Sequence, residues 1–231
     1  MEQDHAKAAD PQGSGAEPGR DLLGPGTMVV DGRYRLASIV ARNGNDTVYS
    51  ALDERARSRV RLRITAHPPD AELQRLHHPA IPAVLDKGRV GRWYYVVLEW
   101  FDGAPVELPP VGNSADLPRL RAWATTAMDL LDALEHAHTT SGRAHGDIGL
   151  HGLWEGSDGA IRFIDFSGPE GALTAEGVPY ASPERLRGLS RDPRSDLYSI
   201  ACVLYAMAYG APPFGTDPID ARAGHLLRQL D

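Results

Sequence analysis

The chain has 231 residues and a formal charge of −7 at neutral pH, and 42% of its residues are hydrophobic. An acidic chain lacks the basic patches that non-specific binding to nucleic acid or to an anionic membrane surface requires. A single cysteine, Cys202, excludes an intrachain disulfide and a cysteine zinc site, and favours a reducing compartment. No apolar run approaches the ~18 residues of a membrane span, and no signal-peptide core leads the chain. We therefore expect a soluble, cytoplasmic protein.

The first 26 residues predict a disordered tail. They are rich in glycine, proline, alanine and aspartate and contain few bulky apolar side chains. Such a segment buries too little surface to offset its ordering entropy. A docking tail is the alternative. We expect the folded domain to occupy residues 27–231.

Short β-rich runs separated by turn residues dominate the next part of the chain. They predict strands over residues 34–40, 47–52, 60–65, 84–90 and 93–99. One short helix fits over 70–77, directly after the helix breakers Pro68 and Pro69. This part therefore predicts a small sheet-rich unit.

After Pro118 the apolar residues recur every three or four positions, which is typical of a long amphipathic helix ending near Gly142. Two short strands are predicted over 152–154 and 161–164. A second apolar helix covers 195–209 and stops at Gly210. A third helix is predicted over 217–230. The chain thus predicts an α+β protein with a larger helical unit after the sheet.

Short strings along the chain carry a resemblance to a known family. The strings include His78-Pro79-Ala80-Ile81, Val97-Leu98-Glu99-Trp100, His145-Gly146-Asp147, Asp165-Phe166-Ser167, Ser182-Pro183-Glu184 and Ser195-Asp196-Leu197-Tyr198-Ser199. In this order they resemble the bacterial, eukaryotic-like Ser/Thr protein kinase family. The resemblance implies a two-lobe kinase-like fold, with a β-rich N-lobe over about 32–99 and a helical C-lobe over about 100–231. It also implies that the C-lobe is truncated at its C-terminal end.

The loop that holds the phosphates of ATP in this family departs from its pattern. Three glycines let backbone amides approach the phosphates closely in the family. Their positions correspond here to Ala41, Asn43 and Asp46. Asp46 also adds a negative charge where the γ-phosphate would lie. This loop is expected to hold a triphosphate poorly.

The rest of the nucleotide pocket also departs from the family's pattern. Arg63 stands at the position of the lysine that pairs with the phosphates, and arginine and lysine are not equivalent there. Asp70 or Glu72 is the candidate carboxylate partner for Arg63. Arg61 replaces the alanine that lies against one face of adenine, and Trp154 replaces a small residue on the other face. A guanidinium over an indole forms a favourable cation–π pair, so we expect Arg61 and Trp154 to fill the pocket.

The catalytic loop keeps one of its chemical groups. Asp147 matches the residue that accepts the proton of the substrate hydroxyl. The family's arginine, lysine and second Mg²⁺ ligand correspond to Gly146, Gly149 and Gly152. Asp165 matches the remaining Mg²⁺ ligand, and its carboxylate suits that cation. The resemblance therefore leaves Asp147 and Asp165 as a remnant pair.

These losses favour a pseudokinase, in which the domain is a regulatory or scaffolding protein-binding module with lost or very weak phosphoryl transfer. We then expect no cofactor, a protein partner, no nucleic acid and no membrane segment in this chain. The alternative is a divergent, low-activity Ser/Thr kinase that uses ATP and Mg²⁺ through residual binding. A domain that never contacts nucleotide is a third reading. Many bacterial relatives continue into a membrane span, so the domain is alternatively the cytosolic part of a longer membrane protein.

Four further residues have structural interpretations. His145 is expected to pack against Phe166 in the core, and Cys202 to be an inert buried thiol. By resemblance, Asp196 accepts backbone N–H bonds from the catalytic loop and braces it. In the family, the residue at Glu184 pairs with an arginine further along the chain; here that partner is missing, or Arg187, Arg191 or Arg194 takes its place.

Overall fold

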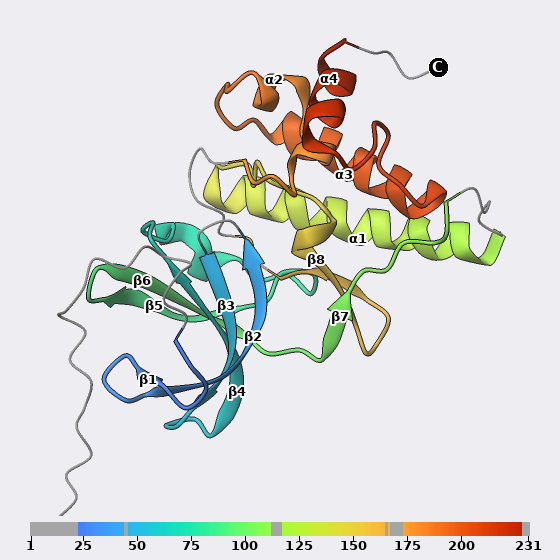
Figure 1. Cartoon of the computed structure of the whole chain (residues 1–231). Helices are drawn as coiled ribbons and strands as arrows, with labels where there is room; N and C mark the ends of the chain where they lie inside the picture. The colour runs from blue at the N-terminus through green and yellow to red at the C-terminus, as the bar shows by residue number, and fades with distance from the viewer. Residues whose placement is uncertain (1–22, 44–45, 112–116, 165, 167–172, 228–231) are drawn as a thin grey trace, which may run out of the picture.

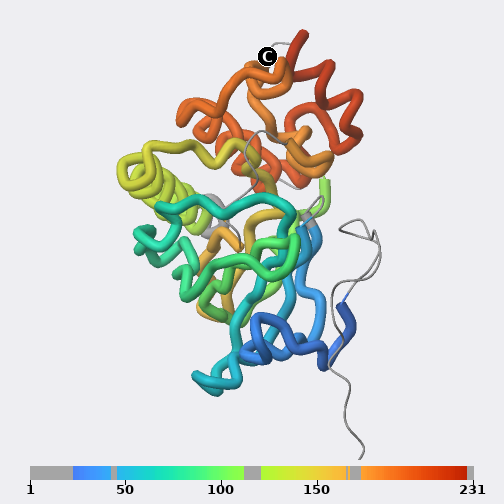
Figure 2. The backbone as a smooth tube through the Cα atoms, turned by 90° about the vertical axis from the view of Figure 1, so that its left-hand side faces the viewer, coloured from blue at the N-terminus to red at the C-terminus, as the bar shows by residue number. Residues whose placement is uncertain are grey.

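The computed structural model describes residues 23–43, 46–111, 117–164, 166 and 173–227. Within these residues a curled sheet forms one side of the molecule and helices form the other (Figure 1). In both views the chain after residue 173 lies on the side of the long helix α1 away from the six-stranded sheet (Figure 1 and Figure 2). The two-lobe α+β architecture implied by the sequence is present.

The N-lobe is a six-stranded antiparallel sheet in the order β1-β2-β3-β4-β6-β5. Its strands are β1 (Met28–Val29), β2 (Tyr34–Asn43), β3 (Asp46–Asp53), β4 (Ser58–Thr65), β5 (Val84–Val90) and β6 (Trp93–Glu99). All five predicted strands are confirmed, and β5 and β6 have the predicted bounds. β1 was not predicted because two residues carry no alternation.

The short helix predicted over about 70–77 is present but shorter than predicted. This segment is a 3₁₀ helix, η1 (Ala71–Arg75), which Asp70 caps by accepting a hydrogen bond from the Glu72 backbone N–H. Leu73 and Leu76 are three residues apart, so both meet the core at three residues per turn.

The C-lobe combines helices with a small three-stranded sheet. Its helices are α1 (Leu117–Ser141), α2 (Pro183–Leu186), α3 (Pro193–Tyr209) and α4 (Pro218–Leu227). Its strands β7 (Gly103–Pro105), β8 (Leu153–Gly156) and β9 (Ile161–Phe163) form an antiparallel sheet, and η2 (Leu150–Gly152) and η3 (Val178–Tyr180) are 3₁₀ helices. The two long predicted helices, the predicted final helix as far as Leu227, and both predicted C-lobe strands are confirmed. The last predicted turn, residues 228–230, lies outside the described residues.

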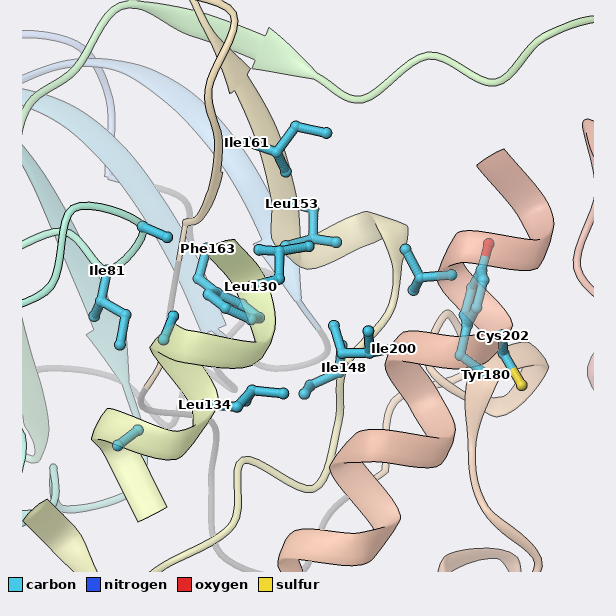
Figure 3. Packing of buried hydrophobic residues seen from close by; sticks show 14 of the residues in the cluster. Ile81, Leu130, Leu134, Ile148, Leu153, Ile161, Phe163, Tyr180, Ile200 and Cys202 are labelled. Carbon is cyan, nitrogen blue, oxygen red and sulfur yellow. The ribbon is translucent and has the colours of Figure 1, made fainter. Parts of the chain in front are cut away.

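Two apolar clusters form the core. In the N-lobe sheet, Tyr34, Leu62 and Val97 belong to one buried cluster. In the second cluster, Leu130 and Leu134 of α1 face β9 and α3 (Figure 3). Residues between β4 and β5, such as Leu73, also belong to this second cluster, which therefore joins the two lobes.

The beginning of the described chain already contacts the sheet. The Gly26 N–H donates to the Leu36 carbonyl at 2.7 Å, inside the segment predicted to be a tail. Residues 1–22 of that segment lie outside the described residues. Among the helices that the structure describes, none has both the length and the apolar composition needed to cross a membrane.

Candidate functional site between the lobes

Strand β4 carries arginines on one face. Residues 59, 61 and 63 alternate with Val60 and Leu62, and side chains two apart lie on the same side of a strand. Val60 and Leu62 belong to the N-lobe core. Arg61 is 0% exposed and Arg63 is 1% exposed. The opposite face of β4 therefore buries two cations, an arrangement that requires specific partners.

Arg61 lies among three aromatic rings. Its guanidinium carbon is 3.7 Å from the centroid of Phe101, 4.9 Å from Trp100 and 5.1 Å from Trp154. Its Nη2 donates to the Phe101 carbonyl at 3.0 Å. Trp100 and Phe101 follow β6 in the segment that connects the lobes, whereas Trp154 is on β8. We call Arg61 with these three residues the aromatic cage.

The charge in the aromatic cage is poorly solvated. Burial lowers the pKa of Arg61 to about 10, and the neighbouring cations Arg59 and Arg162 act in the same direction. Arg61 is still protonated at neutral pH. Within the described residues, its Nε and Nη1 have no hydrogen-bond partner. The aromatic faces supply cation–π attraction at these nitrogens instead.

Arg63 meets a carboxylate inside the sheet. Its Nε lies 3.6 Å from Oδ2 of Asp46, and side-chain exposure is 1% and 4% for the two residues. The register explains this pairing, because Val48 is opposite Arg63 and Asp46 is two residues before Val48 on the same face. Asp46 thus supplies a carboxylate at Arg63.

The two other carboxylates proposed for Arg63 have different partners. Glu72 forms an ion pair with Arg75, and Asp70 lies 3.4 Å from Nη1 of Arg143. Glu72 and Arg75 are three residues apart on η1, so the short helix pairs them locally. The expectation that Asp70 or Glu72 serves Arg63 is replaced by Asp46.

The catalytic-loop backbone is held by Asp196. This carboxylate is 0% exposed and accepts hydrogen bonds from the backbone N–H groups of His145 and Gly146, both at 2.7 Å. It also lies 2.8 Å from Nε2 of His138. The predicted brace is confirmed. Gly146 adopts a φ of 76°, which glycine tolerates better than other residues.

Asp147 is 8% exposed and contacts Thr174. The Thr174 hydroxyl donates to Oδ1 at 3.3 Å, and its backbone N–H donates to Oδ2 at 3.3 Å. Nε2 of His151 lies 3.9 Å from Oδ2. A Cβ added at Gly177 would collide with Oδ1. The segment containing Thr174 therefore closes over the Asp147 carboxylate.

The expected metal ligand, Asp165, lies outside the described residues. Among the residues that are described, no group of three or more histidine, cysteine, aspartate or glutamate side chains could hold a metal ion. Of the remnant pair, only Asp147 lies within the described residues.

The structural interpretations of three other residues are resolved. His145 packs edge-on to Phe166 with ring centroids 5.0 Å apart, as predicted. Cys202 is buried, and burial raises the pKa of its thiol to about 12, which keeps it protonated and inert. Glu184 has a hydroxyl partner. Its Oε1 accepts a hydrogen bond from the Ser195 hydroxyl at 2.8 Å, because Ser195 begins the buried part of α3 directly beside it.

Two cage residues were missed from the sequence. Trp100 ends the string Val97-Leu98-Glu99-Trp100, which did not mark it as a partner of Arg61, and Phe101 belongs to no quoted motif. The alternation of arginine with aliphatic residues over 59–63 was the available signal. It indicates a charged, buried strand face, which needs aromatic or acidic neighbours nearby.

The fold and this loop geometry together define a protein kinase domain. The model of the protein kinase domain family matches residues 71–230, and the chain belongs to that family. It is 31% identical over 222 residues to the serine/threonine-protein kinase PknB of Mycobacterium leprae, covering 84% of this chain and 35% of that protein. It is 29% identical over 218 residues to PknL of Mycobacterium tuberculosis, covering 83% and 53%.

The similarity to solved structures concerns the fold. The kinase domain of Mycobacterium tuberculosis PknI superimposes with a TM-score of 0.62 at 23% identity, covering 85% of this chain and 82% of that one. The chain spans between a third and about half of the length of the curated relatives named above. It is thus a protein kinase domain homologous to bacterial, eukaryotic-like Ser/Thr kinases.

Proposed function

We propose that this chain is a pseudokinase domain, which uses the kinase fold as a regulatory or scaffolding protein-binding module with lost or very weak phosphoryl transfer. One observation carries the proposal. Arg61 occupies the adenine-facing position of the family and is fully buried among Trp100, Phe101 and Trp154. A guanidinium and an indole stand where the base needs a flat apolar slot.

The hydrogen bond to the Phe101 carbonyl supports the occlusion. Arg61 donates to this backbone oxygen in the connector between the lobes. A purine entering beside the connector displaces the side chain from that bond and from three ring faces. The residues at this place therefore fit adenine poorly, and no nucleotide-dependent step is assigned to them.

The phosphate side gives independent support. Arg63 stands at the phosphate-pairing position, but Asp46 places a buried carboxylate 3.6 Å from it. That charge opposes the approach of a triphosphate. Gly149 and Gly152 supply neither the cation nor the amide of the family's catalytic loop. Kinases work mainly by positioning and electrostatic stabilisation, and each loss of ~1.4 kcal/mol slows the reaction tenfold.

A divergent, low-activity Ser/Thr kinase is the second candidate. It is favoured by Asp147, the acceptor for the proton of a substrate hydroxyl, which already contacts the Thr174 hydroxyl at 3.3 Å. In that case Arg63 would attract the phosphates of ATP, and Asp165 would be the ligand of the Mg²⁺ ion. For either candidate we propose a cytoplasmic location, free or as the cytosolic part of a longer membrane protein.

Nucleotide binding tests the proposal directly. Calorimetric titration with ATP, with and without Mg²⁺, is expected to give no saturable heat for the purified chain. Saturable binding of MgATP would contradict the occlusion by Arg61.

Radiolabel transfer separates the two candidates. Incubation with labelled ATP, Mg²⁺ and a generic basic protein is expected to give the same background for the wild type and for Asp147→Asn. Transfer that the wild type performs and Asp147→Asn loses would establish the divergent kinase instead. The Asp147→Asn variant keeps the size of the side chain. A melting temperature equal to that of the wild type excludes a folding defect as the cause of lost transfer.

A further inference from the structure

A cleft of about 940 Å³ lies away from the aromatic cage. Its walls come from η1 and the segment before it, the end of α1, and the chain between α2 and α3. The polar residues that matter are His67, Asp70, Arg143, Arg185 and Arg191. Arg61, Arg63 and Trp154 do not line it, so it is a separate feature of the molecule.

Arg185 is a buried side chain in the wall of this cleft. It is only 7% exposed although it carries a full charge. Its Nε donates to the Gly146 carbonyl at 3.2 Å and its Nη1 donates to the Leu189 carbonyl at 3.0 Å. Its Nη2 has no hydrogen-bond partner. A buried charged donor without an acceptor is rare and costly, and an anion in the cleft would supply the acceptor.

Gly146 makes room for a second arginine in the wall. A Cβ at position 146 would lie 2.7 Å from Cγ and Cδ of Arg191. Any side chain at 146 would therefore push Arg191 out of its present place. The backbone of Gly146 thus contacts Arg185 through its carbonyl and Arg191 through its open Cα face, which brings both arginines to one side of the cleft.

The charge of the cleft is opposite to that of the chain. Three arginines and one aspartate line it, whereas the whole chain carries −7. The aspartate, Asp70, lies 3.4 Å from Arg143. Guanidinium groups present paired N–H donors that match the oxygens of phosphate. A concave cationic surface with a buried, incompletely bonded guanidinium is suited to a compact dianion.

We propose that this cleft binds a phosphate group, either as inorganic phosphate or as a phosphate monoester. Arg185 and Arg191 hold the oxygens, and Arg143 adds charge at the rim. The site does not depend on nucleotide binding or on phosphoryl transfer. It therefore stands whether the domain is a pseudokinase or a weakly active kinase.

Calorimetry tests the site. The purified chain is titrated with inorganic phosphate at constant ionic strength, and a titration with chloride is the comparison. Saturable binding is expected for the wild type. Arg185→Gln is expected to weaken it about tenfold or more, because it removes a charge-assisted hydrogen bond. Arg187→Gln is the matched control, since Arg187 is exposed two residues further along the chain and does not line the cleft. It is expected to leave the affinity within about twofold.

A second arm identifies the source of the phosphate. Phosphothreonine blocked at both ends is titrated beside inorganic phosphate, with blocked threonine as its control. Equal affinities indicate recognition of the phosphate alone, and tighter binding of blocked phosphothreonine indicates a phosphorylated polypeptide. Both outcomes support the site.

Two outcomes overturn it. One is the absence of saturable phosphate binding at tens of millimolar. The other is an equal loss of affinity in Arg187→Gln and Arg185→Gln, which means non-specific surface attraction. If Arg185→Gln melts far below the wild type, Arg191→Gln decides, because Arg191 also lines the cleft and its Cγ and Cδ lie against Gly146. Unchanged affinity in a folded Arg191→Gln then refutes the proposal.

Discussion

Buried charge is stabilised in different ways on the arginine face of β4 and at the loop that carries Asp147. On β4, Arg61 makes one hydrogen bond within the described residues and is otherwise surrounded by aromatic faces. In the loop, Asp196 accepts two backbone N–H groups and contacts His138. The loop geometry is therefore fixed by hydrogen bonds within the C-lobe. One buried charge is thus held mainly by aromatic rings and the other by hydrogen bonds.

The largest effect is expected from Asp196→Ala. The substitution leaves two buried N–H groups without an acceptor, which costs about 3 to 5 kcal/mol of unfolding free energy. Urea denaturation followed by circular dichroism measures it. Asp192→Ala is the control, because Asp192 caps the same helix from a partly exposed position. A loss for Asp196→Ala no greater than that for Asp192→Ala would refute the brace.

Two variants of Arg61 sharpen the contrast with Asp196. Arg61→Ala removes packing from a filled site and is expected to cost about 2 to 4 kcal/mol. Arg61→Met keeps the volume and removes the desolvated charge, so its change is expected to stay below about 1.5 kcal/mol. The same urea series measures both variants. Equal, large losses for both would show that the charge itself, and not the filling of the cage, stabilises the fold.

The smallest effect concerns pH and His225. Burial lowers the pKa of this histidine, whose Nε2 donates to the Pro179 carbonyl and whose Nδ1 accepts from the Tyr198 hydroxyl. The unfolded chain then binds a proton more readily, so stability falls as the pH falls from about 6.5 toward the pKa of the folded protein.

A single histidine contributes at most about 1.4 kcal/mol per pH unit to this slope. Melting temperatures between neutral pH and pH 5 are expected to show the slope reduced in His225→Gln and unchanged in His67→Gln, an exposed histidine. An identical slope in His225→Gln and the wild type would refute the role of His225.

The fold was predicted from the sequence wherever periodicity was strong. Long elements such as α1, α3, β5 and β6 carry enough residues to reveal a period of two or of about 3.6. The short elements β1, β7 and α2 depend on hydrogen bonds to distant parts of the chain. The short helix over 70–77 was predicted, but its bounds, Ala71–Arg75, were not, because a segment this short has too few residues to show a period.

The candidate site was only partly visible. The family's spacing put Arg61 and Trp154 in the same place, and the structure brings the guanidinium carbon to 5.1 Å from the ring centroid. The spacing did not indicate Trp100 and Phe101, because a connector between lobes has no fixed alternation. The pairing of Asp46 with Arg63 required the register of two strands, which no local pattern specifies.

The aromatic cage joins parts that would otherwise move separately. Arg61 belongs to the N-lobe sheet, Phe101 to the connector and Trp154 to the C-lobe sheet. A rigid-body swing of one lobe away from the other must pull a desolvated cation off its rings and expose it to water. We therefore expect the cage to resist lobe opening, and amide exchange in the connector to be faster in Arg61→Ala than in the wild type.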